Sequence, residues 1–519
     1  MNAPIASFPL PDDARRVVVV GAGPGGLAAA MLLRARGAEV TVLERSDRVG
    51  GRTASFTQDG YTFDYGPTFY LYPEGLREVF DACGRSLDEE VELVRLDPMY
   101  RLHFHDGNAF DATPDVERLT AEAARISPED APNVRRYLEE NTAKFGVFKP
   151  ILQRPFNGPR DLFRMDMLRA FPLFRPWLTV DQDLNRWFKH PDLRLAFSFQ
   201  SKYLGMSPFK CPSLFTIVAH VEYGFGVFHP IGGCNAIPQA MARVARDMGV
   251  DIRLNASAEE IELDGRRARA VRLADERLAC DAVVVNGDFS STIPKLIPDA
   301  KRRRWTDKRI AAKKFSCSTF MLYLGLEGRL DHMHHHSFIL SEDYLGNIRD
   351  IDEGRAPREP TIYVQNASVT DPTLAPEGHS TLYVLVPTGN NSGEEDWSTL
   401  APVYREKILD RLSSFSGRDV RAMIRTERMI TPDDWEQQMG IYRGATFNLA
   451  HNLGQMLHWR PRNRFEDVDG VYLTGGGTHP GSGLPTIFES AKIAARLAAD
   501  DIGLGPAAAP AATFREAAE

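Results

Sequence analysis

The sequence predicts an α/β protein, with a Rossmann-like domain assembled from separate parts of the chain and a discontinuous α+β domain. Two observations carry this prediction. Near the N-terminus, a β-branched run enters GAGPGG at Gly21, continues as a helix and reaches a second strand. Near the C-terminus, residues 471–477 (VYLTGGG) again pass from an apolar strand into glycines, and a helix follows. Because the two turns are alike, we place both ends of the chain in the Rossmann-like domain.

The composition is that of a globular protein with more than one packed core. The chain has 519 residues, of which 43% are hydrophobic and 25% are charged. A formal net charge of −8 argues against a nucleic-acid partner, which requires a basic surface. The five cysteines are odd in number and never spaced as C-x-x-C. This pattern favours a reducing compartment and offers no motif for structural zinc.

Residues 17–20 are four valines, a run typical of a parallel strand that is buried on both faces. Gly21, Gly23 and Gly26 follow in the spacing G-x-G-x-x-G. The first glycine allows a tight turn, the second lets a pyrophosphate approach the backbone, and the third lets helix pack on strand. Pro24 suits an early helical position, where its missing N–H is no loss. The arginine pair before the valines also resembles a twin-arginine or anchor signal, but the following strand, turn and helix favour a folded domain.

A second strand and a terminal acid complete the nucleotide-binding pattern. The helix is expected to end near Gly37, and residues 39–43 (EVTVL) form the next strand. Glu44 closes this strand 18 residues after Gly26, where a carboxylate accepts hydrogen bonds from a ribose diol. A glycine fingerprint alone is weak evidence, but these features in this order predict dinucleotide binding. FAD and NAD are both compatible with Glu44.

The residues after Glu44 decide between the two cofactors. Residues 50–52 (GGR) resemble the GGR extension of the FAD-dependent amine oxidase and desaturase superfamily. In that superfamily these residues lie along the cofactor phosphates and the flavin. Residues 61–70 (YTFDYGPTFY) resemble the segment that follows there, with residues 66–68 (GPT) close to the isoalloxazine ring. The resemblance implies FAD.

The C-terminal turn is expected to serve the other end of the same cofactor, because extended FAD is too long for one turn to hold both of its ends. The helix that begins near Pro485 directs free backbone N–H groups forward. A helix N-terminus carries partial positive charge and suits the electron-rich N1/C2 carbonyl edge of a reduced flavin. Glu489 and Ser490, which lie on this helix, are expected to pack or to support the site rather than to catalyse.

Residues 478–497 (THPGSGLPTIFESAKIAARL) make the resemblance more specific. They resemble the C-terminal signature of bacterial and fungal carotenoid desaturases of the phytoene desaturase family, which includes C30 desaturases and diapocarotenoid oxidases. Residues 91–107, 226–261 and 371–390 also match its pattern, and the likeness extends from Val17 to about Gly503. Cys234 and Phe488 are departures that bear on the choice of polyene.

The resemblance implies FAD-dependent desaturation of a long-chain isoprenoid polyene such as phytoene, diapophytoene or a downstream carotene, with oxygen or a quinone as electron acceptor. Three alternatives remain open. The first is oxidation of the terminal methyl groups of a C30 carotenoid to aldehyde or acid. The second is flavin-dependent carotenoid isomerisation. The third is a non-catalytic isoprenoid-binding escort, as in the Rab GDP-dissociation inhibitors that share this fold.

Taken together, the patterns and the resemblance predict a GR2-type FAD site. Its expected cofactor-binding residues are Gly21, Gly23, Pro24, Gly26, Glu44, Arg45, Gly50, Gly51, Arg52, Gly66, Pro67, Thr68, Ala258, Asn286, Gly476, Gly477, Leu484, Pro485 and Thr486. Residues 251–261 (DIRLNASAEEI) are expected to form a strand. By family analogy, backbone near Ala258 meets the adenine and Asn286 ends a cofactor-proximal strand. No catalytic side chain is predicted, because the flavin carries the redox step.

The domains are expected to interleave along the chain. Residues 1–75, 226–300 and 430–505 are assigned to the FAD-binding domain, and residues 76–225 and 301–429 to a substrate and membrane-docking region. Residues 506–519 have the composition of a disordered tail.

Residues 144–178 are the candidate membrane-docking segment. Phenylalanines, leucines and a tryptophan alternate there with seven basic residues, against only Asp161 and Asp166. Rings and leucines can enter the headgroup boundary while Arg and Lys meet anionic lipid. The alternative is a core-packed helical pair with a solvated basic face. We expect a cytoplasmic protein that associates peripherally with the inner face of the membrane, where a lipophilic polyene is accessible.

The run HMHHH at residues 332–336 invites a metal interpretation, because alternate histidines of a strand share one face. Beyond Asp331 no carboxylate is close in sequence, so histidines at a strand edge or in a loop are expected instead, and no metal site is predicted.

Overall fold

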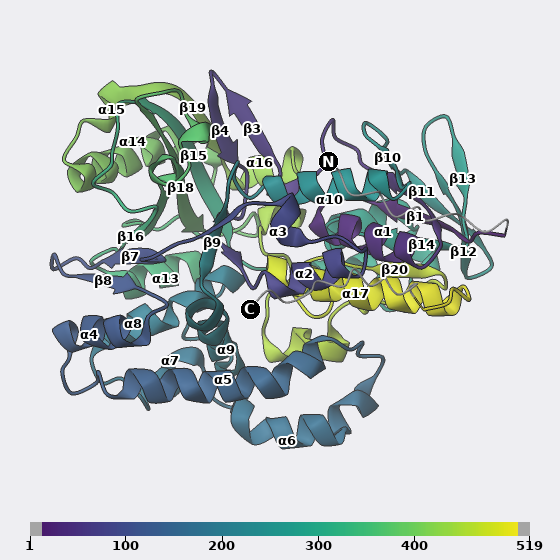
Figure 1. Ribbon diagram of the computed structural model, residues 1–519, viewed down its shortest axis with the longest axis horizontal. Helices are drawn as coiled ribbons and strands as arrows, with labels where there is room; N and C mark the ends of the chain where they lie inside the picture. The colour runs from purple at the N-terminus through teal and green to yellow at the C-terminus, as the bar shows by residue number, and fades with distance from the viewer. Residues whose placement is uncertain (1–12, 507–519) are drawn as a thin grey trace, which may run out of the picture.

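The computed structural model describes residues 13–506. Residues 1–12 and 507–519 lie outside it. Of the tail expected to be disordered, only Pro506 is therefore among the described residues. Figure 1 shows two sheet-based layers side by side and a group of helices below the left-hand one.

A parallel sheet of five strands, in the order β10-β2-β1-β14-β20, forms the first layer. Its strands are β1 (Arg16–Val20), β2 (Glu39–Leu43), β10 (Asp251–Arg253), β14 (Ala282–Val285) and β20 (Val471–Leu473). Strands from three distant parts of the chain therefore share one sheet. The division of the whole chain into domains at the boundaries given above stays a prediction.

The two faces of this sheet belong to two different cores. Val17 and Val19 point into a core shared with α1 (Pro24–Ala35), α10 (Ala236–Asp247) and α17 (Leu484–Asp501). Val18 and Val20 point into the opposite core, because successive strand residues alternate between faces. That second core is closed by β11 (Glu260–Asp264), β12 (Arg267–Arg272), β13 (Arg277–Ala279), α11 (Phe289–Leu296) and α12 (Asp307–Ala311).

A mixed sheet of seven strands forms the second layer, in the order β19-β15-β18-β17-β16-β7-β8. All its pairs are antiparallel except β16 with β7. The strands are β7 (Tyr100–His103), β8 (Ala109–Ala112), β15 (Ser318–Glu327), β16 (His336–Ile339), β17 (Ile362–Gln365), β18 (His379–Thr388) and β19 (Ile424–Ile430).

Each face of the mixed sheet is apolar. Phe320 and Leu322 pack against helix α14 (Trp397–Ser416), which covers the outer face. Met321 and Tyr323 point the other way, into an aromatic-rich core. The sheet therefore separates an ordinary packed core from an aromatic one.

Helices and short strands complete the chain. The remaining helices are α2 (Glu74–Asp81), α3 (Leu87–Glu90), α4 (Val116–Ile126), α5 (Asn133–Leu152), α6 (Met165–Phe174), α7 (Val180–Leu184), α8 (Pro191–Ser198), α9 (Ile217–Ala219), α13 (Tyr344–Asp352), α15 (Val420–Met423) and α16 (Pro432–Gln437). The remaining strands are β3 (Ser55–Gln58), β4 (Tyr61–Asp64), β5 (Tyr70–Leu71), β6 (Leu93–Arg95) and β9 (Val227–Pro230).

Eleven short segments of other helix types are labelled η. They are η1 (Gly51–Thr53), η2 (Pro159–Phe163), η3 (Phe199–Leu204), η4 (Ser213–Thr216), the π-turn η5 (His220–Gly224), η6 (Asp299–Lys301), η7 (Ala367–Val369), η8 (Pro372–Leu374), η9 (Tyr442–Gly444), η10 (Leu453–Gln455) and η11 (Leu457–Trp459).

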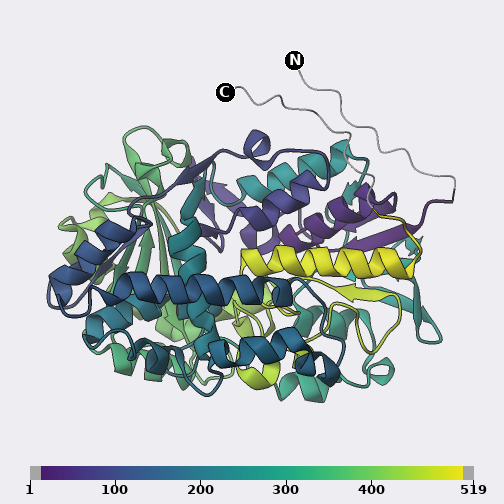
Figure 2. The ribbon, with the colours of Figure 1, turned by 60° about the horizontal axis from the view of Figure 1, so that its bottom comes forward.

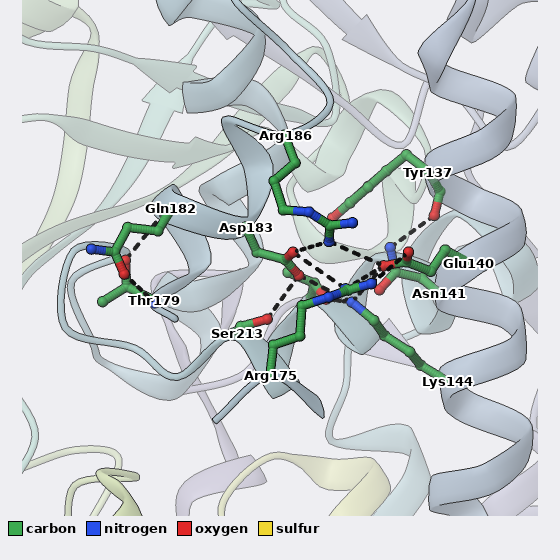
Figure 3. A network of polar contacts seen from close by, with 11 residues as sticks. Tyr137, Glu140, Asn141, Lys144, Arg175, Thr179, Gln182, Asp183, Arg186 and Ser213 are labelled. Atoms are coloured by element: carbon green, nitrogen blue, oxygen red, sulfur yellow. Dashed lines mark hydrogen bonds and ion pairs between the residues drawn. The ribbon is translucent and has the colours of Figure 1, made fainter. Parts of the chain in front are cut away.

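A buried ion-pair network joins α5, α7 and the end of α6 (Figure 3). Lys144, which is fully buried, lies 3.0 Å from Glu140 and 3.1 Å from Asp183. Arg175, directly after α6, lies 2.7 Å from Glu140 and 3.3 Å from Asp183. Because a buried cation is stable only when paired, this network fixes where the chain leaves α6. Two of the seven basic residues in segment 144–178 therefore face inward.

The structure corrects one strand of the sequence analysis. Residues 251–261 (DIRLNASAEEI) were expected to form a single strand, but β10 ends at Arg253 and β11 begins at Glu260 in another sheet. Asn255 turns the chain in the left-handed region (φ 53°), which asparagine tolerates better than most residues. The N–H of Ala256 donates to the carbonyl of Glu44, so the intervening loop crosses the end of β2.

Candidate functional site

The site is built where the parallel strands end. In register, Val20 pairs with Leu43 on one side and with Val285 on the other, and Val285 pairs with Leu473. The next residues, Gly21, Glu44, Asn286 and Thr474, therefore meet at one edge of the sheet. In open α/β sheets, ligands bind outside the carboxyl ends of the strands, where the strand order reverses. Strand β1 is that position here.

The first glycine turn leaves no room for side chains. Gly21 has φ 99°, and its N–H donates to the carbonyl of Leu43 at 2.7 Å. A Cβ added to Gly26 would lie 2.0 Å from the Gly21 carbonyl oxygen, and one added to Gly23 would lie 2.9 Å from Nδ2 of Asn286. Bare backbone therefore lines the start of α1, as close approach by a phosphate requires.

Glu44 is buried, and its carboxylate is bonded at the same edge. One oxygen accepts from the N–H of Ala22 at 2.8 Å, and the other accepts from the N–H of Ser46 at 3.0 Å and its hydroxyl at 2.8 Å. The carboxylate is thus held against the glycine turn. Each carboxylate oxygen can accept more than one hydrogen bond, so capacity for a ribose hydroxyl remains.

Arg52 lies on η1, after Gly50 with φ 110°. Its Nη1 donates to the carbonyl of Thr446 at 3.1 Å. Burial lowers the pKa of Arg52, and the charge of Asp288 opposes this shift. Asn448 bridges the two charged groups when its amide oxygen faces the guanidinium at 3.0 Å and its nitrogen faces Asp288 at 2.7 Å. The guanidinium is therefore oriented before any ligand binds.

The second glycine stretch is held by an arginine that the sequence analysis missed. Arg460 is fully buried and donates to the carbonyls of Leu449, Gly476 and Thr478 at 3.1, 2.8 and 3.1 Å. Burial lowers the pKa of Arg460 to about 9. The only sequence signal was its place beside a proline upstream of the glycines. Helix α17 then begins at Leu484, one residue before the expected start, and no side chain caps its N-terminus.

One cavity lies between the segment that contains Arg52 and the second glycine stretch. Its volume is about 990 Å³, at the upper end of the usual range for ligand pockets. Arg52 and residues 66–68 line it from the N-terminal side, and Gly476, Leu484 and Pro485 line it from the C-terminal side. Aromatic side chains form much of the remaining wall: Phe69, Phe199, Tyr203, Phe338, Tyr363 and Tyr383.

The other predicted site residues lie around this cavity. The turn residues Gly21, Gly23, Pro24 and Gly26 are at the sheet edge beside it, with Asn286 packed on them. A Cβ added to Gly51 would lie 3.6 Å from the Cα of Gly23. The backbone at Gly51 therefore faces the first glycine turn. Thr486 donates to the carbonyls of residues 481–483 and thereby braces the first turn of α17.

Three predicted residues are more peripheral. Gly477 is buried against Phe289, where an added Cβ would approach to 2.8 Å. Ala258 is buried beyond the end of β2 in the loop described above. Arg45 is exposed, and its side chain donates to the carbonyl of Met439 at 2.5 Å.

A polar line crosses the aromatic wall. The Tyr363 hydroxyl lies 2.6 Å from Thr68 Oγ1 and 2.8 Å from His336 Nδ1, and burial keeps the pKa of His336 well below its ordinary value. His335 is buried next to it, with its ring 4.4 Å from that of His336. Two histidines of HMHHH therefore lie inside the protein rather than at an exposed strand edge. Only His336 lies in β16, and a strand of four residues is too short for its pattern to reveal this.

A second buried polar group stands behind the wall. Glu222, on the π-turn η5, is fully buried and accepts a hydrogen bond from the Tyr100 hydroxyl at 2.5 Å. Gln200 donates to the same carboxyl oxygen at 3.4 Å. Burial raises the pKa of Glu222 to about 7, and the hydrogen bonds oppose this rise. The sequence offered no signal for this group.

The residues present fit FAD. The bare glycine turn, the buried Glu44 carboxylate and the oriented Arg52 supply sites for pyrophosphate, ribose and flavin in the expected order. Thr446 lines the cavity, and its buried hydroxyl has no partner, which leaves it available to a ligand. The uncapped N-terminus of α17 adds backbone donors on the opposite side.

None of the helices within residues 13–506 is both long enough and apolar enough to cross a bilayer. Within the same residues, no group of three or more His, Cys, Asp or Glu side chains is placed to hold a metal ion.

Residues 24–499 match the family described as flavin-containing amine oxidoreductases. A 4,4'-diapophytoene desaturase (4,4'-diapolycopene-forming) of Methylomonas sp is 41% identical, over 93% of this chain and 95% of the relative. An all-trans-zeta-carotene desaturase of Myxococcus xanthus is 39% identical, over 95% and 94%. A 4,4'-diapophytoene desaturase (4,4'-diaponeurosporene-forming) of Staphylococcus aureus is 33% identical, over 94% and 100%.

Solved structures resemble the fold at lower identity. A putrescine oxidase variant has a TM-score of 0.63 at 18% identity, covering 94% of this chain and 98% of its own. Cyclohexylamine oxidase from Brevibacterium oxydans has a TM-score of 0.57 at 17% identity, with the same coverage. These structures confirm the predicted fold class, a Rossmann-like sheet combined with a mixed substrate-side sheet.

Proposed function

Because the chain belongs to the family of flavin-containing amine oxidoreductases, we propose that it is an FAD-dependent desaturase of a long-chain isoprenoid polyene in carotenoid biosynthesis. The resemblance to carotenoid desaturases inferred from residues 478–497 is confirmed by relatives at 33–41% identity over more than 90% of the chain. The observation that carries the proposal is the aromatic-walled cavity that Arg52 and residues 66–68 line from one side and the second glycine stretch lines from the other.

We assign the cofactor contacts as follows. The turn from Gly21 to Gly26 and the N-terminus of α1 hold the pyrophosphate, and Glu44 holds the adenosine ribose. Arg52 and residues 66–68 lie along the flavin from one side, and the N-terminus of α17 approaches its N1/C2 edge from the other. Bound FAD supplies an acceptor for a hydride taken from a C–H next to an existing double bond.

The protein's own contribution is orientation and exclusion of water. A hydrocarbon has no polar handle, so Phe69, Phe199 and Phe338 position it by shape and apolar contact. When a hydride leaves one carbon and a proton leaves its neighbour, the two remaining electrons form the new double bond. The Tyr363 hydroxyl, which is hydrogen-bonded to Thr68 Oγ1 and His336 Nδ1, is one of the polar groups in this wall.

We also propose that the protein docks on a membrane surface through α6 and its flanks. Phe163, Met165, Leu168, Phe171 and Trp177, here called the α6 patch, are between 51% and 73% exposed. Figure 1 shows α6 at the lower edge of the molecule, outside α5, and Figure 2 brings this lower side forward. Arg160, Arg164 and Arg169 are exposed beside the patch. Exposed rings and leucines with neighbouring arginines are the composition of an interfacial segment, which supports peripheral association of a cytoplasmic protein with the inner face of the membrane.

The function is tested by expression in a host supplied with phytoene or diapophytoene, with absorbance and mass measured on the pigments. Desaturation lengthens the chromophore and removes two hydrogens at each step. Oxygenated ends on an unchanged chromophore would identify the terminal oxidase instead, and altered geometry at constant mass would identify the isomerase. A purified protein without flavin would support the escort.

Docking is tested by sedimentation with vesicles. The triple variant Phe163→Ser, Phe171→Ser, Trp177→Ser should remain in the supernatant with its FAD retained. Val403→Ser is the matched control, because Val403 is 65% exposed on α14, away from the patch. Equal sedimentation of the triple variant and the wild type would contradict docking through the α6 patch.

A further inference from the structure

A second, basic pocket lies outside the FAD cavity. Its volume is about 570 Å³, and it is formed by three separate segments. Arg304, Arg309 and Lys313 come from the region of α12, and His458, Trp459 and Arg462 come from η11 and the residues after it. Pro159, the first residue of η2, closes the third side. We call this the α12–η11 pocket.

The pocket has more positive than negative charge. It is lined by four cations, Arg304, Arg309, Lys313 and Arg462. Glu466 is shared between Arg304 at 3.2 Å and Arg462 at 3.4 Å. Two further acids have backbone partners: Asp161 accepts from the N–H groups of residues 157 and 158, and Asp467 accepts from those of Arg304 and Trp305. Lys313 has no acidic partner among the described residues and lies over the Trp305 ring at 5.3 Å.

A buried polar atom in the pocket has no hydrogen-bond partner. His458 is only 6% exposed, and its Nδ1 makes no hydrogen bond. Burial and the charges of Arg304 and Arg462 lower the pKa of His458, so its ring is neutral near pH 7 and can donate through one nitrogen. An unpartnered buried imidazole nitrogen beside Arg309 and Lys313, neither of which has an acidic partner within residues 13–506, is a feature of an anion site.

The surroundings indicate which anion. Trp459, in the pocket wall, is 43% exposed, and Phe163, at the end of the η2 segment that begins at Pro159, is 73% exposed. Lys313 lines both this pocket and the FAD cavity. The charged pocket therefore lies between exposed apolar side chains and the substrate cavity. A phosphate attached to an acyl chain can contact both the cations of the pocket and the exposed apolar side chains, whereas a free phosphate ion contacts only the cations.

We propose that the α12–η11 pocket binds the phosphate group of an anionic membrane phospholipid. This inference rests on the docking part of the proposed function and adds a specific headgroup site to it. A lipid held there places Lys313, which lines both the pocket and the FAD cavity, against the bilayer surface. At this point a polyene can pass from the bilayer into the cavity.

The test compares vesicle binding of the full-length, FAD-loaded protein. Vesicles contain phosphatidylcholine alone or with phosphatidylglycerol. The double variant Arg309→Gln, Lys313→Gln should bind phosphatidylglycerol vesicles about 25-fold more weakly than wild type at low salt, since each basic residue near a charged membrane contributes roughly fivefold. Its binding to phosphatidylcholine should not change. Lys308→Gln is the matched control, because Lys308 is exposed on α12 and does not line the pocket.

A soluble arm separates the possible sources of phosphate. Short-chain phosphatidylglycerol below its micelle concentration should change the fluorescence of Trp305 and Trp459, and inorganic phosphate should not compete with it. Inorganic phosphate binding as tightly as the lipid would overturn the lipid assignment. Equal loss of vesicle binding in the double variant and in Lys308→Gln would overturn the pocket itself. The α6-patch variant should lose its binding to vesicles of either composition, so failure of docking is distinguishable from failure of the headgroup site.

Discussion

Replacement of Gly26 by alanine should open the first glycine turn and release FAD. An added Cβ would stand 2.0 Å from the Gly21 carbonyl oxygen, whereas real Cβ contacts below 3.0 Å are essentially never seen. The turn and the start of α1 must therefore separate by at least 1.0 Å, the difference between these two distances. The Gly21 carbonyl is backbone, so no flexible side chain can move aside to relieve the contact.

The cost follows from this displacement. Overpacking of this kind typically costs about 1–3 kcal/mol. The strain falls on the turn proposed to hold the pyrophosphate, and closing this turn around FAD must restore the contact. We therefore expect Gly26→Ala to weaken FAD binding by about 5- to 150-fold. The apo protein should lose less stability than the FAD-loaded protein, because only the loaded form requires the closed turn.

Gly146→Ala is the matched control. Gly146 lies within α5, and nothing stands within 4 Å of a Cβ added there. The same chemical change should raise the free energy of unfolding by about 0.5–1 kcal/mol, because alanine loses less backbone entropy in a helix. FAD affinity is measured by flavin fluorescence after equilibrium dialysis, and stability by thermal unfolding. A Gly26→Ala variant that keeps wild-type FAD affinity would refute the reasoning.

Three further predictions concern buried groups around the cavity. Glu44→Gln should weaken FAD binding at least about tenfold in dialysis, since a bond to a charged group contributes about 1.5–3 kcal/mol, and Glu39→Gln at the exposed start of β2 should not. Burial raises the pKa of Glu222 from 4.5 to about 7, so this group stabilises the folded state below pH 4.5, and that contribution is lost as pH rises through 7. The difference in the free energy of unfolding between wild type and Glu222→Gln, measured in urea, should therefore change by about 3 kcal/mol between these two pH values. Parallel pH profiles of the two proteins would contradict the assignment. Tyr363→Phe leaves two buried partners unpaired and should lower the stability measured by thermal unfolding by about 2 kcal/mol. Tyr383→Phe should cost less, because the Tyr383 hydroxyl donates to one carbonyl. Equal losses in the two variants would contradict the two-partner geometry.

The local pattern around each glycine stretch was predictable from the sequence. Four valines before Gly21 and an acid after the next strand specify a βαβ unit through short-range geometry alone, and the structure has β1, α1 and β2 where these residues indicate. The expected helix after Pro485 begins one residue earlier, at Leu484. These features were predictable because a tight turn, a helix start and a buried strand each depend on a few consecutive residues.

Groups that act only through distant contacts were not predictable in the same way. Arg460 is an ordinary arginine in the sequence, yet it is fully buried and donates to two carbonyls of the second glycine stretch and to that of Leu449. Glu222 acquires its raised pKa only because Tyr100 and the aromatic core close around it.

The sequence by itself therefore determined that both ends of this chain carry glycine-rich turns between a strand and a helix, because those turns are local backbone shapes that particular residues permit. Only the tertiary structure decided that Arg52 and the second glycine stretch line one cavity, that two histidines of HMHHH lie behind its wall, and that a basic pocket opens beside it. Burial, charge neutralisation and the meeting of segments distant in sequence are properties of packing, and no short run of residues contains them.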